Sequence, residues 1–296
     1  MNQLITILGP TASGKSTLGI ELAQDLNGEI VSADSRQVFR GLDIGSGKVT
    51  NEEQAQVSHH LLDVVDPMDD FSVSHFQKLA FTAIDDIIGR NKLPFLVGGT
   101  ALYIYSVIDN YKLQDIAPDP KLRKQFEKKS LSELQAMVPD GALNKDDYNN
   151  PRRLIRAIEK LEAGVPIEPQ KGPQKYENII FGIDFPREEL YQRIDQRVDE
   201  RLKDGMIEEV ENLRANGVSD EWLVSLGLEY KWITEFLQGK WQRDEMIKRL
   251  KGAIHAFARR QMTWFKKDKQ IIWVKDAKEA EKILEKKMGF VKSQIP

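Results

Sequence analysis

The sequence predicts an α/β fold with a mainly parallel sheet, into which a helical domain is inserted. Short apolar segments bounded by turn residues alternate with helical patterns, and this alternation is typical of parallel strands connected by helices. The predicted strands are residues 4–8, 29–31, 94–97, 178–183 and 270–274.

A change of composition marks the insertion. Between Leu113 and Gln174 the chain becomes polar and helical, punctuated by APDP, VPDG, NNP and PIEPQKGP, with no convincing strand. We therefore expect residues 113–174 to form an all-helical insertion domain, with residues 1–112 and 175–296 as the two parts of the α/β core.

The composition of the 296-residue chain excludes several classes of site. It has no cysteine, which excludes disulfides and thiolate metal sites, and its four histidines are few for a zinc site. Any metal should therefore be bound by oxygen atoms. No segment reaches the roughly 18 apolar residues of a membrane span, and Met1–Ile7 lacks the pattern of a secretory signal. We expect a monomeric cytoplasmic protein with no membrane partner.

Charge is unevenly distributed, although the formal net charge is only −3. Residues 51–72 hold six acidic side chains and no Lys or Arg, whereas residues 241–270 hold nine basic side chains against three acidic ones. Both charged segments can be solvated helix faces. The basic segment, residues 241–270, can instead be a surface that binds nucleic acid. Charge alone leaves both interpretations open.

The segment after the first predicted strand has the spacing of a phosphate-binding loop, G-x-x-x-x-G-K-[ST]. Its glycines let backbone N–H groups face a phosphate, and the start of the following helix adds positive potential. The lysine adds a point charge, and the Ser16 hydroxyl is a ligand for Mg²⁺. We therefore expect a P-loop NTPase-like fold that binds a diphosphate or nucleotide through Gly9, Pro10, Thr11, Ala12, Ser13, Gly14, Lys15 and Ser16.

A second GSGK sequence, at residues 45–48, imitates part of this motif. The upstream position that should be glycine is Leu42. We therefore do not interpret residues 45–48 as a second phosphate loop.

Polar residues follow two further strands at the edge where parallel strands end. Asp34, Ser35 and Gln37 come after strand 29–31, and Gly98–Thr100 follow strand 94–97. Ligands of α/β proteins bind at this carboxyl edge, so both groups are expected near the phosphate loop. Asp34 could hold Mg²⁺ or act as a general base, and the sequence leaves both roles open.

Two later helical patterns carry positive charge. The helix after Pro186 places Arg193, Arg197 and Arg201 on one stripe, where either nearby glutamates or a bound polyanion could compensate them. In the pattern 247–265 the basic residues face away from an apolar stripe, on a surface long enough to follow a phosphate backbone. The stripe predicted to be buried is Ile247, Leu250, Ile254, Phe257, Trp264 and Phe265.

Taken together, these motifs resemble one family, the tRNA dimethylallyltransferases, also called tRNA isopentenyltransferases. The resemblance covers nearly the whole chain, from Leu4 to Trp273. The segments that carry it are, in order, GPTASGKS, SADSRQVF, DIGSGK, HHLLDVVDP, VGGTALY, NNPRRLIRAIEK, DFPREELYQRIDQRV and RRQMTWFKK.

The resemblance implies that the phosphate loop holds the diphosphate of dimethylallyl diphosphate as a leaving group, so that no phosphoryl group is transferred. The acceptor that it implies is the N6 amine of the adenine 3′ to the anticodon of tRNA. The implied catalytic groups are Asp34 as general base and, around the leaving diphosphate, Lys15, Arg197 and Ser16 with Mg²⁺.

The same resemblance assigns residues to tRNA. The acceptor adenine must be flipped out of the anticodon loop, the insertion would grip the anticodon stem-loop, and the basic helix would follow its phosphates. The residues implied are Asp34, Ser35, Arg36, Gln37, Thr100, Arg123, Arg152, Arg153, Leu154, Ile155, Arg156, Arg259 and Arg260, with part of the SLGLEYK turn from Ser225.

The chain departs from the family pattern in four places. Ser16 replaces a common threonine, Phe39 stands where tyrosine is frequent, the insertion is short, and SLGLEYK is spaced differently from the usual glycine-tyrosine turn.

Three other functions are considered. An isopentenyltransferase acting on free adenine nucleotides would share the core and the phosphate loop, but it would need neither the insertion nor the basic helix. A P-loop kinase or NTPase acting on a small metabolite would consume ATP or GTP and transfer no carbon. A non-catalytic RNA-binding protein would leave Lys15 and Asp34 without a role.

Overall fold

The computed structural model describes residues 2–113 and 119–288, and the chain divides into two compact units. One unit, the core unit, comprises Met1–Ile108 and Gln174–Pro296, and the other comprises Asp109–Pro173. The sequence predicts the insertion at residues 113–174. The second unit begins four residues earlier than this prediction and ends one residue earlier.

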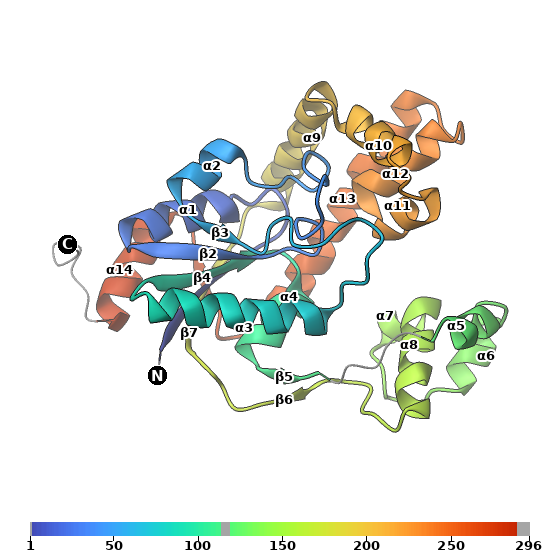
Figure 1. Ribbon diagram of the computed structural model, residues 1–296, viewed down its shortest axis with the longest axis horizontal. Helices are drawn as coiled ribbons and strands as arrows, with labels where there is room; N and C mark the ends of the chain where they lie inside the picture. The colour runs from blue at the N-terminus through green and yellow to red at the C-terminus, as the bar shows by residue number, and fades with distance from the viewer. Residues whose placement is uncertain (1, 114–118, 289–296) are drawn as a thin grey trace. The chain divides into compact units, whose positions relative to one another are not determined.

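The core unit contains a six-stranded sheet in which every neighbouring pair of strands is parallel. This confirms the predicted α/β class. The order is β3-β2-β4-β1-β7-β8 (Figure 1). The strands are β1 (Gln3–Leu8), β2 (Gly28–Ala33), β3 (His59–His60), β4 (Leu93–Gly98), β7 (Glu177–Ile183) and β8 (Ile272–Val274).

One strand of this sheet is not predicted by the sequence. β3 has only two residues, and both are histidines that pair with Ile30 and Val31 of β2. A segment so short carries no apolar periodicity, so it gives no strand signal.

Helices cover both faces of the sheet (Figure 1). Helices α1 (Lys15–Asp25) and α14 (Ala277–Met288) pack on one face, around Ile5, Phe95 and Phe181. Helices α3 (Val73–Gly89) and α4 (Ala101–Ile108) cover the other face, where the rings of Phe76 and Tyr103 stack at 4.1 Å. The short helix α2 (Asn51–Gln56) precedes β3. With both faces covered, the central strands are mostly apolar, as expected for a parallel sheet, although Thr6, Glu29 and Ser32 are also buried.

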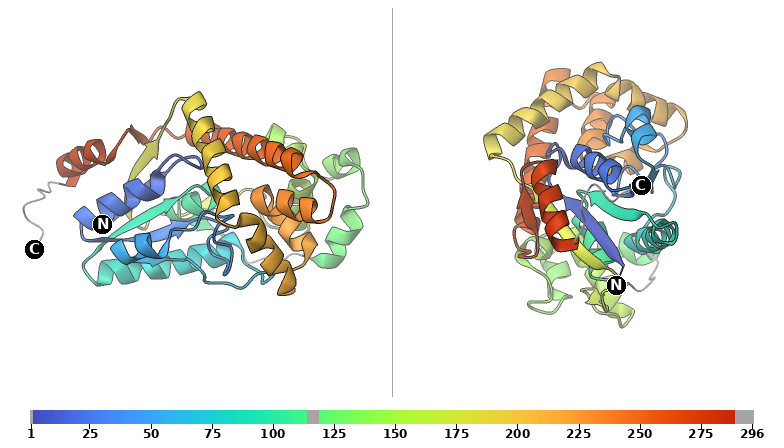
Figure 2. Two further views of the ribbon diagram at one scale, coloured as in Figure 1. Left: turned by 90° about the horizontal axis from the view of Figure 1, so that it is seen from above. Right: turned by 90° about the vertical axis from the view of Figure 1, so that its left-hand side faces the viewer.

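A cluster of five helices follows β7 in the chain (Figure 2). They share a hydrophobic core with Val38, Phe39 and Leu42 from the segment after β2. This core fixes that segment at the carboxyl edge of the sheet. The helices are α9 (Arg187–Lys203), α10 (Met206–Ala215), α11 (Asp220–Leu226), α12 (Leu228–Leu237) and α13 (Arg243–Phe265).

The buried stripe of α13 differs from the prediction. Leu250, Ile254 and Phe265 are buried as expected, but Trp264 is 46% exposed. The buried positions are Met246, Leu250, Ile254, Ala258, Gln261 and Phe265. Trp264 lies at the edge of this stripe, and its ring centroid is 6.4 Å from that of Tyr105. A polar residue, Gln261, takes a core position instead.

The second unit is helical with a small ribbon. Its core includes Phe126, Leu134 and Leu154. Contrary to the prediction, Gln170–Lys171 form a strand, which pairs antiparallel with Tyr111–Lys112. The elements are β5 (Tyr111–Lys112), α5 (Pro120–Phe126), α6 (Leu131–Ala136), α7 (Lys145–Tyr148), α8 (Pro151–Glu162) and β6 (Gln170–Lys171).

Among the described residues, no helix combines the length and the apolar character needed to cross a bilayer.

A charge cluster stabilises the amino end of β2. The buried carboxylate of Glu29 accepts two hydrogen bonds from the Arg90 guanidinium, at 2.5 and 2.6 Å, and one from Lys92 at 2.7 Å. His60 Nε2 lies 2.7 Å from the same carboxylate. These hydrogen bonds, those of Arg90 above all, hold the pKa of Glu29 well below its usual range.

We expect Glu29→Gln to lower the free energy of unfolding at neutral pH by about 2 kcal/mol, because it weakens the hydrogen bonds that Arg90 and Lys92 donate to a buried carboxylate. The pKa of Glu29 is depressed in the folded state, so its contribution is complete above about pH 4.5 and is lost as the pH falls below that value. Urea unfolding at pH 7 and pH 3.5 measures both effects. Glu21→Gln, at an exposed position of α1, is the control and should change neither value.

Candidate active site

The phosphate loop connects β1 to α1 and adopts a conformation that only certain residues allow. Gly14 has a φ of 83° and Ala12 a φ of 62°, both in the left-handed region. The turn is closed by a hydrogen bond from Ser13 N to Pro10 O at 3.3 Å, and Lys15 and Ser16 lie in the first turn of α1. Backbone N–H groups at such a helix start form a binding site for an anion.

Ser13 has a buried hydroxyl that finds no hydrogen-bond partner among the described residues. A Cβ at Gly9 would lie 2.7 Å from this oxygen, so a larger residue at position 9 would displace it. An unsatisfied buried hydroxyl in a loop of this kind is available to a ligand.

Gln261 connects the phosphate loop to a second strand end. Its Oε1 accepts a hydrogen bond from Thr11 N at 3.0 Å, and its Nε2 donates to Gly99 O at 2.8 Å. The side chain thus fixes the loop after β1 relative to the loop after β4. Sequence reasoning missed this residue. The available signal was a glutamine on the apolar stripe of α13.

Three cations gather around the phosphate loop. Burial, together with the charges of Arg197 and Arg201 on α9, lowers the pKa of Lys15 to about 8, and the Asp34 carboxylate opposes that shift. Burial and the charge of Arg201 lower the pKa of Arg197 to about 10. Burial is the main cause of both shifts, and the neighbouring guanidiniums add to it.

Arg197 has no hydrogen bond or ion pair with any residue in the described part of the chain, although it is only partly exposed. Its predicted neighbour on the stripe, Arg193, is different: it pairs with Glu189 at 3.3 Å and packs over the ring of Phe185. For this arginine stripe of α9, the sequence leaves two interpretations open, compensation by nearby glutamates or by a bound anion, and they apply to different residues. Local compensation holds for Arg193, and Arg197 remains available to an anion.

Asp34 follows β2 and faces this cationic region. Its Oδ1 accepts hydrogen bonds from Arg36 N at 2.8 Å and Gln37 N at 3.4 Å, which fixes the carboxylate. Its Oδ2 has no hydrogen-bond partner among residues 2–113 and 119–288. The hydroxyl of Thr100 accepts a hydrogen bond from Ser35 N at 3.1 Å and so joins the ends of β2 and β4.

Arg36 and Gln37 are already engaged within the core unit. Arg36 donates to Leu226 O at the end of α11. Gln37 accepts from Ser32 Oγ at 3.1 Å and donates to Gly47 O at 3.1 Å. Any contact of these two residues with RNA would have to use their remaining polar groups.

The GSGK segment of residues 45–48 is not arranged as a phosphate loop. The Lys48 ammonium donates to Phe39 O at 3.0 Å and to the carboxylates of Asp43 and Asp63. No helix starts directly at this segment, because α2 begins at Asn51 behind its N-cap Thr50.

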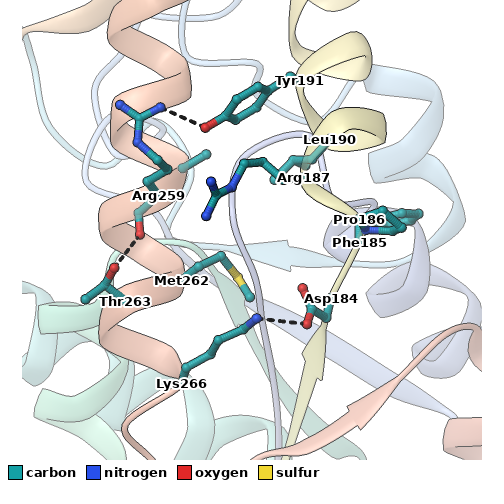
Figure 3. Close-up of a pocket in the computed structure, with 11 residues that line it drawn as sticks. Asp184, Phe185, Pro186, Arg187, Leu190, Tyr191, Arg259, Met262, Thr263 and Lys266 are labelled. Atoms are coloured by element: carbon teal, nitrogen blue, oxygen red, sulfur yellow. Dashed lines mark hydrogen bonds and ion pairs between the residues drawn. The ribbon is translucent and has the colours of Figure 1, made fainter.

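A cavity of about 640 Å³ lies between the start of α9 and the carboxyl half of α13 (Figure 3). Arg187, Arg259 and Lys266 line it. Arg259 donates to the Tyr191 hydroxyl at 2.7 Å, and Lys266 pairs with Asp184 at 3.2 Å. Arg260, the neighbour of Arg259, is exposed and lies 5.8 Å from the Phe257 ring.

In the second unit, Arg123 and Arg156 bind one buried carboxylate. Glu159 accepts from Arg123 at 2.7 and 3.0 Å and from Arg156 at 2.8 Å. Burial raises the pKa of Glu159, but the two arginines outweigh it, and the net pKa is lowered. Leu154 and Ile155 are 0% and 6% exposed and belong to the core of this unit, so a contact of these residues with RNA would have to use their backbone. Arg152 and Arg153 are exposed at the start of α8.

Comparison with known proteins decides the family. A profile described as IPP transferase matches residues 37–268, and one described as isopentenyl transferase matches residues 2–67. The chain belongs to the IPP transferase family. It is therefore a prenyltransferase, as the resemblance of its motifs predicted.

Close relatives and solved structures agree. A tRNA dimethylallyltransferase 2 of Bacteroides fragilis is 42% identical over 99% of this chain and 97% of its own length. A tRNA dimethylallyltransferase of a Roseiflexus species is 44% identical over 90% and 91% of the two chains. The crystal structure of the full-length tRNA isopentenylpyrophosphate transferase from Bacillus halodurans is 36% identical, with a TM-score of 0.74 over 98% and 96% of the two chains.

A eukaryotic dimethylallyltransferase acting on tRNA is also similar. It is 25% identical and has a TM-score of 0.75, over 96% of this chain and 78% of its own. The P-loop-like α/β fold is thus shared with IPP transferases that are distant in sequence.

We expect Gln261→Leu to lower the free energy of unfolding by about 2 kcal/mol, because it leaves the Thr11 N–H and the Gly99 carbonyl without partners. Amide hydrogen exchange at Thr11 should accelerate in parallel. Gln270→Leu, at an exposed position, is the control. Unchanged exchange at Thr11 would mean that Gln261 does not hold the loop.

Proposed function

We propose that this prenyltransferase transfers a dimethylallyl group from dimethylallyl diphosphate to the exocyclic N6 amine of the adenine 3′ to the anticodon in tRNA, with release of diphosphate. The observation that carries the proposal is the pairing at one sheet edge of an uncompensated cationic region, Lys15 and Arg197, with a fixed carboxylate, Asp34. The names of the relatives, tRNA dimethylallyltransferases, support the choice of donor and acceptor.

The cationic side of the site suits a departing diphosphate. As the bond between the allylic carbon and oxygen breaks, the diphosphate takes the electron pair and its negative charge grows. The N–H groups of the phosphate loop are fixed before the reaction, and Lys15 and Arg197 lie beside them, so this charge is stabilised with little reorganisation. The unsatisfied hydroxyl of Ser13 is a further donor for a phosphate oxygen.

Asp34 suits the acceptor side. The adenine amine forms a bond to the allylic carbon and must lose one proton as it does so. In our proposal the Oδ2 of Asp34 accepts that proton, while its Oδ1 stays bound to the backbone N–H groups of Arg36 and Gln37. The amine becomes acidic only as it is alkylated, so no base stronger than a carboxylate is needed.

The residues present fit Mg²⁺ bound mainly through its substrate. The described residues contain no group of three or more His, Asp or Glu side chains that could hold a metal ion. Mg²⁺ commonly takes one or two protein ligands and fills its other positions with phosphate oxygens and water. In our proposal Ser16, in the first turn of α1, supplies the protein ligand. The ion would neutralise charge on the diphosphate.

Two surfaces favour tRNA over a free adenine nucleotide as the acceptor. In the core unit, Arg259 and Arg260 are exposed on α13. In the second unit, Arg152 and Arg153 are exposed on α8, and Arg123 and Arg156 are oriented by Glu159. A small acceptor would need neither surface, whereas an anticodon stem-loop offers a phosphate backbone to both. Such an acceptor implies a cytoplasmic enzyme.

The main test supplies dimethylallyl diphosphate and Mg²⁺ with unmodified tRNA, AMP or ATP, followed by mass analysis of nucleosides. We expect a five-carbon addition to tRNA only. Addition to AMP or ATP alone would favour the free-nucleotide enzyme, and release of phosphate from ATP without carbon transfer would favour a kinase or NTPase.

We expect Asp34→Asn to lower kcat by about 10²–10⁴-fold, because it removes the general base. The Kd for tRNA should change by less than about 3-fold, since the amide keeps the hydrogen bonds to the loop. Single-turnover kinetics and filter binding measure the two quantities. Asp70→Asn, at an exposed position, is the control. Equal losses in kcat and in tRNA binding would remove Asp34 from the role of base.

The pKa of Lys15, lowered to about 8, predicts a pH dependence of donor binding. The charged ammonium binds the diphosphate, so the affinity for dimethylallyl diphosphate should fall as the pH rises through about 8. The donor itself is fully ionised above about pH 7 and does not contribute to the change. Calorimetric titration without tRNA, between pH 7 and pH 9.5, measures it. Lys15→Met should bind weakly with a flat profile; a pH dependence that persists in this variant would contradict the assignment.

A further inference from the structure

Gly47 and two arginines of α9 occupy the same small volume. A Cβ at Gly47 would lie 1.5 Å from Nη2 of Arg201 and 2.6 Å from Nη2 of Arg197. Gly47 also has a φ of 61°, which favours glycine. The absence of a side chain at position 47 is therefore what lets both guanidiniums lie side by side against the backbone.

Arg201 is held in this place by its own contacts. It donates to Gly45 O at 3.3 Å and lies 3.6 Å from the Glu229 carboxylate. The side chains of Arg201 and Glu229 are only 13% and 12% exposed. Arg201 is thus paired with Glu229, whereas Arg197 beside it has no ion pair within the described part of the chain.

The loop that receives the arginines is itself fixed. Glu209 accepts hydrogen bonds from the backbone N–H groups of Asp43, Ile44 and Gly45 at 2.6–3.0 Å, and from the Tyr230 hydroxyl at 3.0 Å. At the other end of the loop, Gln37 binds Gly47 O. A loop held at both ends keeps the guanidiniums in one position before any ligand arrives.

We propose that Arg201 is a second guanidinium for the donor's diphosphate, beside Arg197, and that Gly47 and Glu229 hold it there. The inference rests on the proposed function for the identity of the anion. Its support is the convergence of Lys15, Arg197 and Arg201 at one place, where the carboxylates of Glu229, Asp34 and Glu53 act on them. A diphosphate would bring negative charge into direct contact with these cations, and a guanidinium binds it through two N–H groups.

The first experiment measures binding of inorganic pyrophosphate with Mg²⁺ to the full chain by calorimetry. We expect Arg201→Met to weaken binding by about 10- to 100-fold, the loss typical of one hydrogen-bonded charge. Lys203→Met removes one positive charge from an exposed position of the same helix and is the matched control. Unchanged affinity in a folded Arg201→Met protein would overturn the proposal.

A double-mutant cycle tests the role of Gly47. Gly47→Ala places a methyl group where Arg201 lies, so it should weaken pyrophosphate binding as Arg201→Met does. In the Arg201→Met background the same change should cost less affinity than it does alone, because only the contact with Arg197, at 2.6 Å, remains. Additive losses would mean that Gly47 acts independently of Arg201, which would overturn this part of the inference.

Glu229→Gln separates binding from stability. It removes a negative charge near the anion, while Arg201 keeps the Gly45 carbonyl and gains an amide oxygen as acceptors, so pyrophosphate should bind at least as tightly as in the wild type, although the folded state is less stable. If Arg201 serves only to pair Glu229, both variants should lose stability and leave affinity unchanged. A wild-type chain that binds pyrophosphate through Arg201 but prenylates no tRNA would refute the proposed function and leave this inference standing.

Discussion

The structure depends on keeping positive charges together in the absence of their ligand. Lys15, Arg197 and Arg201 repel one another, and partial burial removes much of the water that would screen them. Such an arrangement is unfavourable in the free protein. The rest of the fold must offset the unfavourable free energy of this repulsion. A bound anion would relieve the repulsion. A site built in this way binds its anion without reorganising, which is the condition for stabilising a leaving group.

The offsetting interactions come from elements far apart in the chain. Gln261 of α13 connects the loops after β1 and β4, and Glu209 of α10 holds the loop that receives the arginines. The parallel sheet makes this possible, because it brings the carboxyl ends of β1, β2 and β4 to one edge. The helices after β7 then supply polar side chains from above that edge. Each of these groups satisfies backbone polar atoms of a loop that has no regular structure of its own.

Local patterns predicted the framework but not these supports. The motif around Lys15 and the position of Asp34 after a strand follow from short stretches of sequence, so both could be placed at one edge in advance. The buried position of Gln261 could not be predicted, because an argument from periodicity assigns polar residues to the surface. The same argument predicts that Trp264 is buried, whereas it is exposed. The contact of Gly47 with Arg201 joins residues 154 positions apart and depends on the absence of one methyl group, which no periodic pattern records.

The number of basic residues in a segment does not by itself indicate an RNA surface, because ion pairs in the folded chain neutralise some of them. The basic window of residues 241–270 is partly neutralised within the core unit: Arg249 pairs with Glu245, Lys251 with Asp199 and Lys266 with Asp184. Among the described residues, Arg260 and Lys267 have no ion pair, and both are exposed in or just after the carboxyl half of α13. Uncompensated cations are the ones that release counterions when they meet phosphates. By this criterion, applied to the part of the chain that the structure describes, α13 offers unpaired cations at both ends, Arg243 and Lys248 in its amino half and Arg260 and Lys267 at its carboxyl end, so charge alone does not locate the predicted RNA contact.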